Sequence, residues 1–281
     1  MREQLVTFGT HRNLSGVVTL PEGSERERPA VLILNSGLIH RVGACRISVK
    51  LARVLSDAGH TVLRFDFASI GDSAPSPDNL GVEEGHTVEI IEALDFMSER
   101  FGSQTFIIYG LCSGARDGFQ AALRDERIVG LVQIDGYAYR NLPYFLHHYL
   151  PRIPRRAVWR HLFRERLPRA LARPFRRSAD RQLENMVVQI WPEYPPRRRI
   201  EEGYAELVAR GVRFYVLYTG SWADQYNYRA QFLDMFSGVD FNGCLTLQYM
   251  PDATHILPEP EAQERVLSEV RKWAGGDVAR S

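Results

Sequence analysis

Short apolar runs alternate with amphipathic segments along most of this chain, and this alternation limits the folds that it can adopt. The run AVLILN at 30–35 is continuously apolar, as expected for a strand buried on both faces of a sheet. The segment at 47–59 has helical spacing and ends at a glycine. Strands that alternate with helices favour a mostly parallel sheet flanked by helices. The sequence therefore predicts an α/β fold with strands at 5–8, 14–20, 30–35, 61–67, 105–111, 128–135, 212–220 and 244–250, and helices at 47–59, 82–102, 113–125, 224–236 and 259–274.

One stretch breaks the alternation. Residues 138–200 are rich in arginine and proline, with aromatic residues in YFLHHYL, AVWRHLF and IWPEYPP. A chain of 281 residues can bury a sizeable core as one large α/β domain that carries an insertion. We therefore expect an α/β core made of residues 1–137 and 201–281, with residues 138–200 inserted after the sixth strand as an Arg-rich helical lid.

Charge is unevenly distributed along the chain. The formal net charge is +1, yet residues 138–200 contain 15 arginines and four acidic residues, a local balance of +11. Codon bias explains an excess of arginine over lysine, but it does not explain this separation of sign. A basic lid would attract an acidic acyl carrier protein or the phosphates of coenzyme A. A solvated, Arg-rich helix surface is the alternative interpretation.

The cysteines and the apolar runs indicate the cellular compartment and whether a metal site is present. Cys45, Cys112 and Cys244 are too few and too scattered for a disulfide framework, and no clustered His/Cys spacing suggests a metal site. No apolar run approaches the length of a membrane span, and the first residues lack the pattern of a signal peptide. We expect a cytoplasmic protein with no membrane span, no metal and no cofactor.

The segment FIIYGLCSGARDGF at 106–119 carries the strongest chemical signal. Gly110, Cys112 and Gly114 have the spacing of a nucleophile elbow, a strained strand-to-helix turn with small residues on either side of the nucleophile. The N–H groups at the start of the following helix would favour a thiolate and later an oxyanion. Ser113 is the competing nucleophile by chemistry, but the glycine spacing puts Cys112 at the apex.

A nucleophile needs a base, and in this kind of fold the chain order is nucleophile, acid, histidine. His255 alone among the eight histidines lies in a loop between the last strand and the last helix. Asp224 follows a predicted strand and is the leading candidate for the acid that fixes the tautomer of His255. Asp135, at the end of the preceding strand, is the alternative.

Acyl chemistry also needs an oxyanion hole. One donor is expected to be the backbone N–H of Ser113, and the other an N–H of Gly37 or Leu38 in the loop after the strand at 30–35. His40 and Arg41 follow in the same loop. They are candidates to contact an anionic group of the substrate, and capping of the next helix is the alternative role.

These residues resemble a known family. The segment at 35–73, the phrase GLCSGA at 110–115 and the segments around Asp224 and His255 look like the α/β-hydrolase superfamily. The phrases HRVG, RFDF and GLCSGA are similar in particular to exosortase A system-associated hydrolases and related biosynthetic-cluster hydrolases. The resemblance implies acyl transfer, or hydrolysis of an ester or thioester, through a covalent intermediate. Cysteine in the elbow also occurs in dienelactone hydrolases, which usually lack a long lid.

The cysteine favours one reaction class. A thiolate is more nucleophilic than an alcohol, and its acyl adduct is itself a thioester that can pass to a second acceptor. We therefore predict a thioesterase or acyltransferase that acts through an acyl-Cys112 intermediate on carrier-protein or coenzyme A thioesters. The alternatives are an ester or lactone hydrolase of the dienelactone-hydrolase type, and a non-catalytic binding protein on a hydrolase fold. The combined spacing of Cys112, Asp224 and His255 argues against a nucleic-acid-binding protein.

Overall fold

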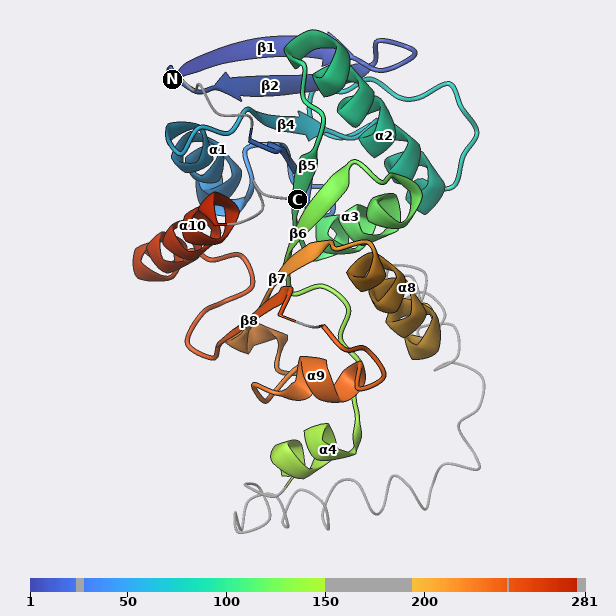
Figure 1. Ribbon diagram of the computed structural model, residues 1–281, viewed down its shortest axis with the longest axis vertical. Coiled ribbons are helices and arrows are strands. Elements are labelled where there is room, and N and C mark those ends of the chain that lie inside the picture. Colours follow the sequence, from blue (N-terminus) through green and yellow to red (C-terminus); the bar gives the residue numbers. More distant parts are fainter. Residues whose placement is uncertain (24–27, 150–193, 242, 277–281) are drawn as a thin grey trace, which may run out of the picture.

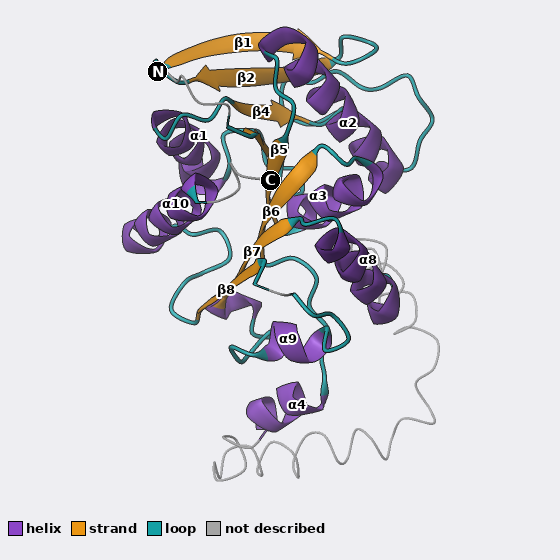
Figure 2. Cartoon of the chain, viewed as in Figure 1, coloured by secondary structure: helices purple, strands orange, loops and turns teal. Residues whose placement is uncertain are grey.

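The computed structural model describes residues 1–23, 28–149, 194–241 and 243–276, and its centre is an eight-stranded sheet (Figures 1 and 2). The strand order is β1-β2-β4-β3-β5-β6-β7-β8. The strands are β1 (Arg2–Phe8), β2 (Leu14–Leu20), β3 (Ala30–Ile33), β4 (Val62–Asp66), β5 (Phe106–Leu111), β6 (Ile128–Ile134), β7 (Arg213–Thr219) and β8 (Leu245–Met250). All eight predicted strands are therefore present.

Most of this sheet is parallel, as the alternation predicts. Only the pairs β1 with β2 and β2 with β4 are antiparallel; β4, β3, β5, β6, β7 and β8 run parallel to one another. Every residue of β3, β4 and β5 is buried, which agrees with continuously apolar strands covered on both faces. The carboxyl ends of the parallel strands meet at one edge of the sheet, and ligand sites in such sheets form at that edge.

Helices cover both faces of the sheet, and each face has its own apolar core. In Figure 1, α1 and α10 lie on one side, and α2, α3 and α8 lie on the other. Leu51 and Trp273 belong to the first core, whereas Ile90, Phe119 and Tyr204 belong to the second. The long helices are α1 (Ile47–Asp57), α2 (Val82–Phe101), α3 (Ser113–Arg124), α8 (Arg197–Ala209) and α10 (Pro260–Gly275).

The predicted helix at 224–236 is wrong over its first half. Only α9 (Gln231–Met235) is α-helical, and the 3₁₀ turn η5 (Gly220–Trp222) precedes it. The ring of Tyr226 stacks on that of Tyr218 at 3.7 Å, and the side chain of Gln231 bonds to the backbone N–H of Asn227 and the carbonyl of Gln225. These contacts hold the segment in a loop despite its helical spacing.

Most of the predicted lid, residues 150–193, lies outside the described residues. Before that gap stands the short helix α4 (Leu142–Tyr149). After it, α8 begins at Arg197, within the predicted lid range, and Ile200 and Tyr204 are buried in the core. No helix in the described part of the chain is both long enough and apolar enough to cross a membrane.

A buried polar network holds the loops after β3 and β4 together. Asp66, fully buried at the end of β4, accepts hydrogen bonds from the side-chain amide of Asn35 at 3.0 Å and from the backbone N–H of Arg41 at 2.5 Å. The guanidinium of Arg41 bonds to Asp66 and, at 2.6 Å, to the exposed carboxylate of Asp72. Asn35 also accepts a bond from the backbone N–H of Phe67. The network therefore fixes both loops at the carboxyl edge of the sheet.

Asp66→Ala is expected to destabilise the protein by about 3 kcal/mol or more, because it leaves the buried guanidinium of Arg41 without its main partner. Asp72→Ala removes the exposed partner of the same arginine and is expected to cost at most about 1 kcal/mol. Urea unfolding of both variants and the wild type measures the difference. Equal losses of unfolding free energy in the two variants would show that burial of the Arg41–Asp66 pair does not increase its contribution to stability.

Candidate active site

Cys112 stands at the apex of a sharp turn between β5 and α3. Its backbone has φ 57° and ψ −114°, a strained combination for a residue with a side chain. A Cβ on Gly110 would lie 2.2 Å from the backbone of Gly114, and a Cβ on Gly114 would lie 2.4 Å from the carbonyl oxygen of Asn35. Both glycines are therefore required by close backbone packing, which is the physical reason for the spacing in the sequence.

His255 lies beside the thiol. It follows β8 in the chain, as the sequence predicts, and its Nδ1 lies 2.7 Å from Oδ2 of Asp135. Its ring also has a side-chain hydrogen bond with Cys112 and stacks on Trp222 at 4.8 Å. Burial disfavours the charged ring, but the hydrogen bonds with Asp135 and Cys112 outweigh it and raise the pKa of His255 to about 9. These partners therefore favour the protonated, cationic ring.

Asp135 is the carboxylate that orients this histidine. It follows β6 directly, is almost fully buried, and accepts bonds from the backbone N–H of Thr219 at 2.7 Å and its hydroxyl at 2.6 Å. With His255 as third donor, the carboxylate is held by β7 on one side and by the histidine loop on the other. Cys112 and Asp135 thus follow the neighbouring strands β5 and β6, and His255, from the loop after β8, interacts with both.

The structure corrects the leading prediction for the acid. Asp224 is exposed, and its carbonyl oxygen accepts bonds from Arg140 and Tyr144, while the ring of His255 faces Asp135. The reason is the 3₁₀ turn that follows β7, which carries Asp224 beyond the end of the strand. Asp135, the alternative acid predicted from the sequence, directly follows β6, so its carboxylate lies at the edge of the sheet where His255 is found.

The thiol opens into a cavity of about 690 Å³, which we call the Cys112 cavity. Its wall includes Ser113 and the loop residues Gly37 and Leu38, all three of which are predicted to contribute to the oxyanion hole. The backbone N–H of Gly37 already donates to the hydroxyl of Ser113 at 2.7 Å. This bond leaves the N–H of Leu38 and that of Ser113, at the start of α3, as the better pair of donors. The remaining lining residues are Ser36, Ala68, Ser69, Ile70, Val82, Glu83, His86, Arg116, Asp117, Gln120 and Tyr137.

The structure does not bring the predicted substrate contacts His40 and Arg41 to this cavity. Arg41 is buried in its pairs with Asp66 and Asp72, and its role is to fix the loop. His40, Asp66 and Asp72 also offer ligand atoms within 4.8 Å of one another, the spacing of a metal site. Because the guanidinium of Arg41 bonds to both carboxylates, the chain itself supplies the cation of this cluster.

The sequence matches a known family over most of the chain. A sequence profile described as the alpha/beta hydrolase fold matches residues 30–251. The chain belongs to the alpha/beta hydrolase family. Among curated proteins, no sequence matches this hydrolase significantly.

Solved structures with the same fold are distant in sequence. A proline iminopeptidase from Mycobacterium smegmatis has a TM-score of 0.58 and 13% identity, with 98% of this chain and 99% of that chain covered. A serine hydrolase without lid from Xanthomonas campestris has a TM-score of 0.54 and 19% identity, covering 99% and 94%. An esterase domain from Rhodothermus marinus has a TM-score of 0.57 and 13% identity, covering 98% of each chain. At these identities the likeness shows the fold alone.

Several residues of this hydrolase site have no signal in the sequence. Thr219 holds Asp135, Trp222 stacks on His255, and Ser221 accepts a bond from the backbone N–H of His255. Each is adjacent in space and distant in the chain from the residue that it supports. Only the position of Thr219 at a strand end, at the edge where ligand sites form, could have suggested it.

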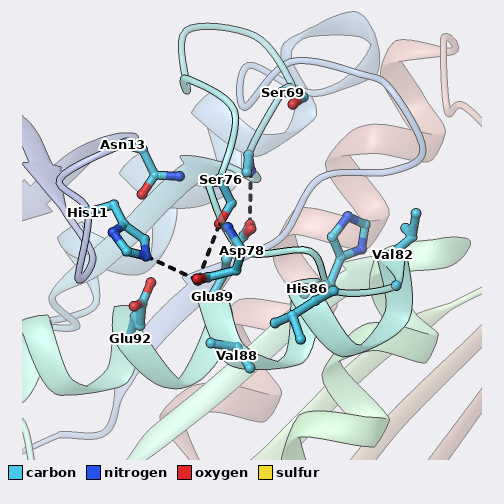
Figure 3. Close-up of a pocket in the computed structure, with 14 residues that line it drawn as sticks. His11, Asn13, Ser69, Ser76, Asp78, Val82, His86, Val88, Glu89 and Glu92 are labelled. Atoms are coloured by element: carbon cyan, nitrogen blue, oxygen red, sulfur yellow. Dashed lines mark hydrogen bonds and ion pairs between the residues drawn. The ribbon is translucent and has the colours of Figure 1, made fainter.

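A second His–Asp pair lines the Cys112 cavity. Nδ1 of His86 lies 3.0 Å from Oδ2 of Asp117, and the ring stacks on Phe67 at 4.0 Å. His86 also lines an adjoining cavity of about 260 Å³, drawn in Figure 3, where His11 lies 3.1 Å from Asp78 and Glu89 faces the same space. Burial raises the pKa of Glu89. The two cavities share the wall formed by His86, Val82, Ala68 and Ser69.

We predict that the His255 ring titrates near pH 9, followed by NMR of histidine-labelled protein. Asp135→Asn should bring its pKa back toward 6.5 or lower, because the strongest favourable partner is lost; Asp224→Asn should leave it unchanged. A shift caused by Asp224→Asn instead would restore Asp224 as the acid. Because the folded pKa lies above the unfolded one, the stability contributed by the charged ring is complete below about pH 6.5 and is lost as the pH rises through about 9.

Proposed function

We propose that this alpha/beta hydrolase transfers acyl groups from thioesters through an acyl-Cys112 intermediate, with His255 as proton carrier and Asp135 as its orienting partner. The observation that carries the proposal is the contact between a thiol at a strained apex and a histidine whose pKa is raised to about 9. An imidazolium beside a thiol favours the thiolate, which is the reactive form. A serine at the same place would need a neutral histidine to remove its proton.

The reaction balances with these groups alone. The thiolate of Cys112 attacks the carbonyl carbon of the thioester, the carbon–sulfur bond to the carrier breaks, and the leaving thiolate takes the proton of the His255 imidazolium. The acceptor, which is water, an amine or an alcohol, then gives a proton to the neutral imidazole and attacks the acyl-Cys112 carbonyl. Cys112 leaves as a thiolate beside the regenerated imidazolium.

The negative oxygen of each tetrahedral intermediate needs donors. The backbone N–H of Ser113 stands at the start of α3, where the helix leaves it without an intrahelical acceptor and where the helix dipole is positive. The N–H of Leu38 is the proposed second donor. The bond from the N–H of Gly37 to the Ser113 hydroxyl ties the two donor segments together.

The substrate class follows from the nucleophile and from charge. The exchange of one thioester for another is nearly isoenergetic, so a cysteine suits transfer from a carrier protein or from coenzyme A. The first residues of α8, Arg197, Arg198 and Arg199, are exposed and lie in the basic stretch of the chain. They are proposed to attract an acidic carrier protein or the phosphates of coenzyme A.

We expect Cys112→Ala to lower turnover of an acyl thioester by about a thousandfold or more, since the proposed covalent intermediate forms on this thiol. Intact-mass measurement after brief mixing should detect a single acyl adduct on the wild type and none on Cys112→Ala. Cys112→Ser should react slowly, as an ester. The matched control is Cys244→Ala, which removes a thiol outside the cavity.

Three results would contradict this assignment. An adduct mapped to Ser113, or one that persists in Cys112→Ala, would place the nucleophile elsewhere. Fast turnover of oxygen esters and lactones with no turnover of thioesters would favour the dienelactone-type alternative. The absence of any adduct or turnover with a broad acyl panel would favour a non-catalytic binding protein.

Replacing Arg197, Arg198 and Arg199 with glutamine should raise KM for a carrier-protein or coenzyme A thioester several-fold and flatten the salt dependence of kcat/KM, because exposed charges act over a Debye length of about 10 Å. The control removes three exposed arginines outside α8, namely Arg2, Arg100 and Arg271. If both triple variants behave alike, the charges of α8 do not select the substrate.

A further inference from the structure

Arg116 is the arginine of the Cys112 cavity. It lies on α3, four residues after Cys112, and it lines the cavity into which the thiol opens. Cys112 is the N-cap residue of α3, and Arg116 lies in the first turn of that helix. Arg116 and the thiol therefore line the same space, in which an acyl chain on Cys112 would lie.

Arg116 makes no ion pair with any carboxylate in the described part of the chain, although Glu83 and Asp117 line the same cavity. The neighbouring Asp117 is bonded to His86, and Glu83, which also lines the cavity, lies beyond ion-pair distance. Arg41 and Arg127 are different, because each is paired with two aspartates. An arginine that pairs with none of the described acids, in a largely apolar cavity, is suited to an anion brought by a ligand.

Tyrosine rings support this arginine from one side. The guanidinium carbon of Arg116 lies 5.6 Å from the centre of the Tyr194 ring, and that ring packs edge-on against Tyr137 at 5.7 Å. Stacking on an aromatic ring restricts the guanidinium plane and leaves its N–H edge for a planar anion. Tyr137 itself lines the cavity, so this support belongs to the same wall.

We propose that Arg116 binds a carboxylate at the far end of the acyl chain, which makes half-thioesters of dicarboxylic acids the preferred acyl donors. This inference rests on the proposed function and adds the class of acyl group. The phosphates of a carrier protein or of coenzyme A stand at the far end of the pantetheine arm, many bonds from the thioester sulfur. An arginine in the cavity, in the first turn after Cys112, is placed for a group on the acyl side of the thioester, only a few bonds from the reacting carbonyl.

The test compares adipyl and hexanoyl thioesters of N-acetylcysteamine, which have the same chain length and differ in the terminal carboxylate. Binding is measured by calorimetry on the Cys112→Ala protein, so that no turnover is required. We expect the adipyl thioester to bind about tenfold more tightly or better, the effect of a charged hydrogen bond. Arg116→Gln should abolish this preference, Arg116→Lys should keep part of it, and the control Arg271→Gln, on α10, should leave it unchanged.

Other outcomes would overturn the inference. The first is that the Cys112→Ala protein binds the adipyl and hexanoyl thioesters equally well. The second is that the preference for the adipyl thioester survives Arg116→Gln. The third is that Arg116→Gln weakens the binding of hexanoyl-coenzyme A more than that of the hexanoyl N-acetylcysteamine thioester. The last would mean that Arg116 contacts the carrier phosphates. If Arg116→Gln does not fold, the salt dependence of the adipyl preference in the Cys112→Ala protein decides, because an electrostatic preference falls with ionic strength. Turnover that survives Cys112→Ala would refute the proposed function and leave this binding result standing.

Discussion

The close approach of three backbone segments at the end of β5 is the constraint on which the site depends. Gly114 packs against the carbonyl of Asn35, and Gly110 packs against Gly114, at distances that a side chain would not allow. This packing forces Cys112 into its strained conformation and brings the loop after β3 next to the start of α3. The proposed nucleophile and the proposed oxyanion donors are therefore placed by one steric condition rather than by separate interactions.

Two polar networks fix the positions of the two loops that flank this turn, the loop after β3 and the loop that carries His255. On one side, Asp66 holds the loop after β3 through Asn35 and Arg41. On the other, Asp135 holds the histidine loop through Thr219 and His255. Both aspartates stand at or just after the carboxyl ends of parallel strands, are buried, and are fully occupied by donors. A strand end is well suited to this role, because neighbouring strands restrain its backbone.

The charged groups that lie near the thiol are distinct from the exposed arginines at the start of α8. Near the thiol, the charged groups are the His255 imidazolium and Arg116, and the acids of the same wall are partly engaged, as Asp117 is by His86. The exposed arginines at the start of α8 belong to the outer surface. Positive charge is thus found in two separate places, one in the cavity and one on the outer surface.

The α/β-hydrolase superfamily was implied by resemblance, while the sequence by itself determined an α/β fold, the eight strands, the elbow spacing around Cys112, and the position of His255 after the last strand. These follow from local patterns: continuous apolar runs, helical spacing, and glycines on either side of a tight turn. Tertiary structure alone decided that Asp135 and not Asp224 faces His255, that Arg41 belongs to a loop network, and that residues 224–230 form a loop. The physical reason is that these outcomes depend on which strand ends become neighbours, on the 3₁₀ turn after β7, and on the burial of Tyr226 and Gln231, none of which is encoded in spacing along the chain.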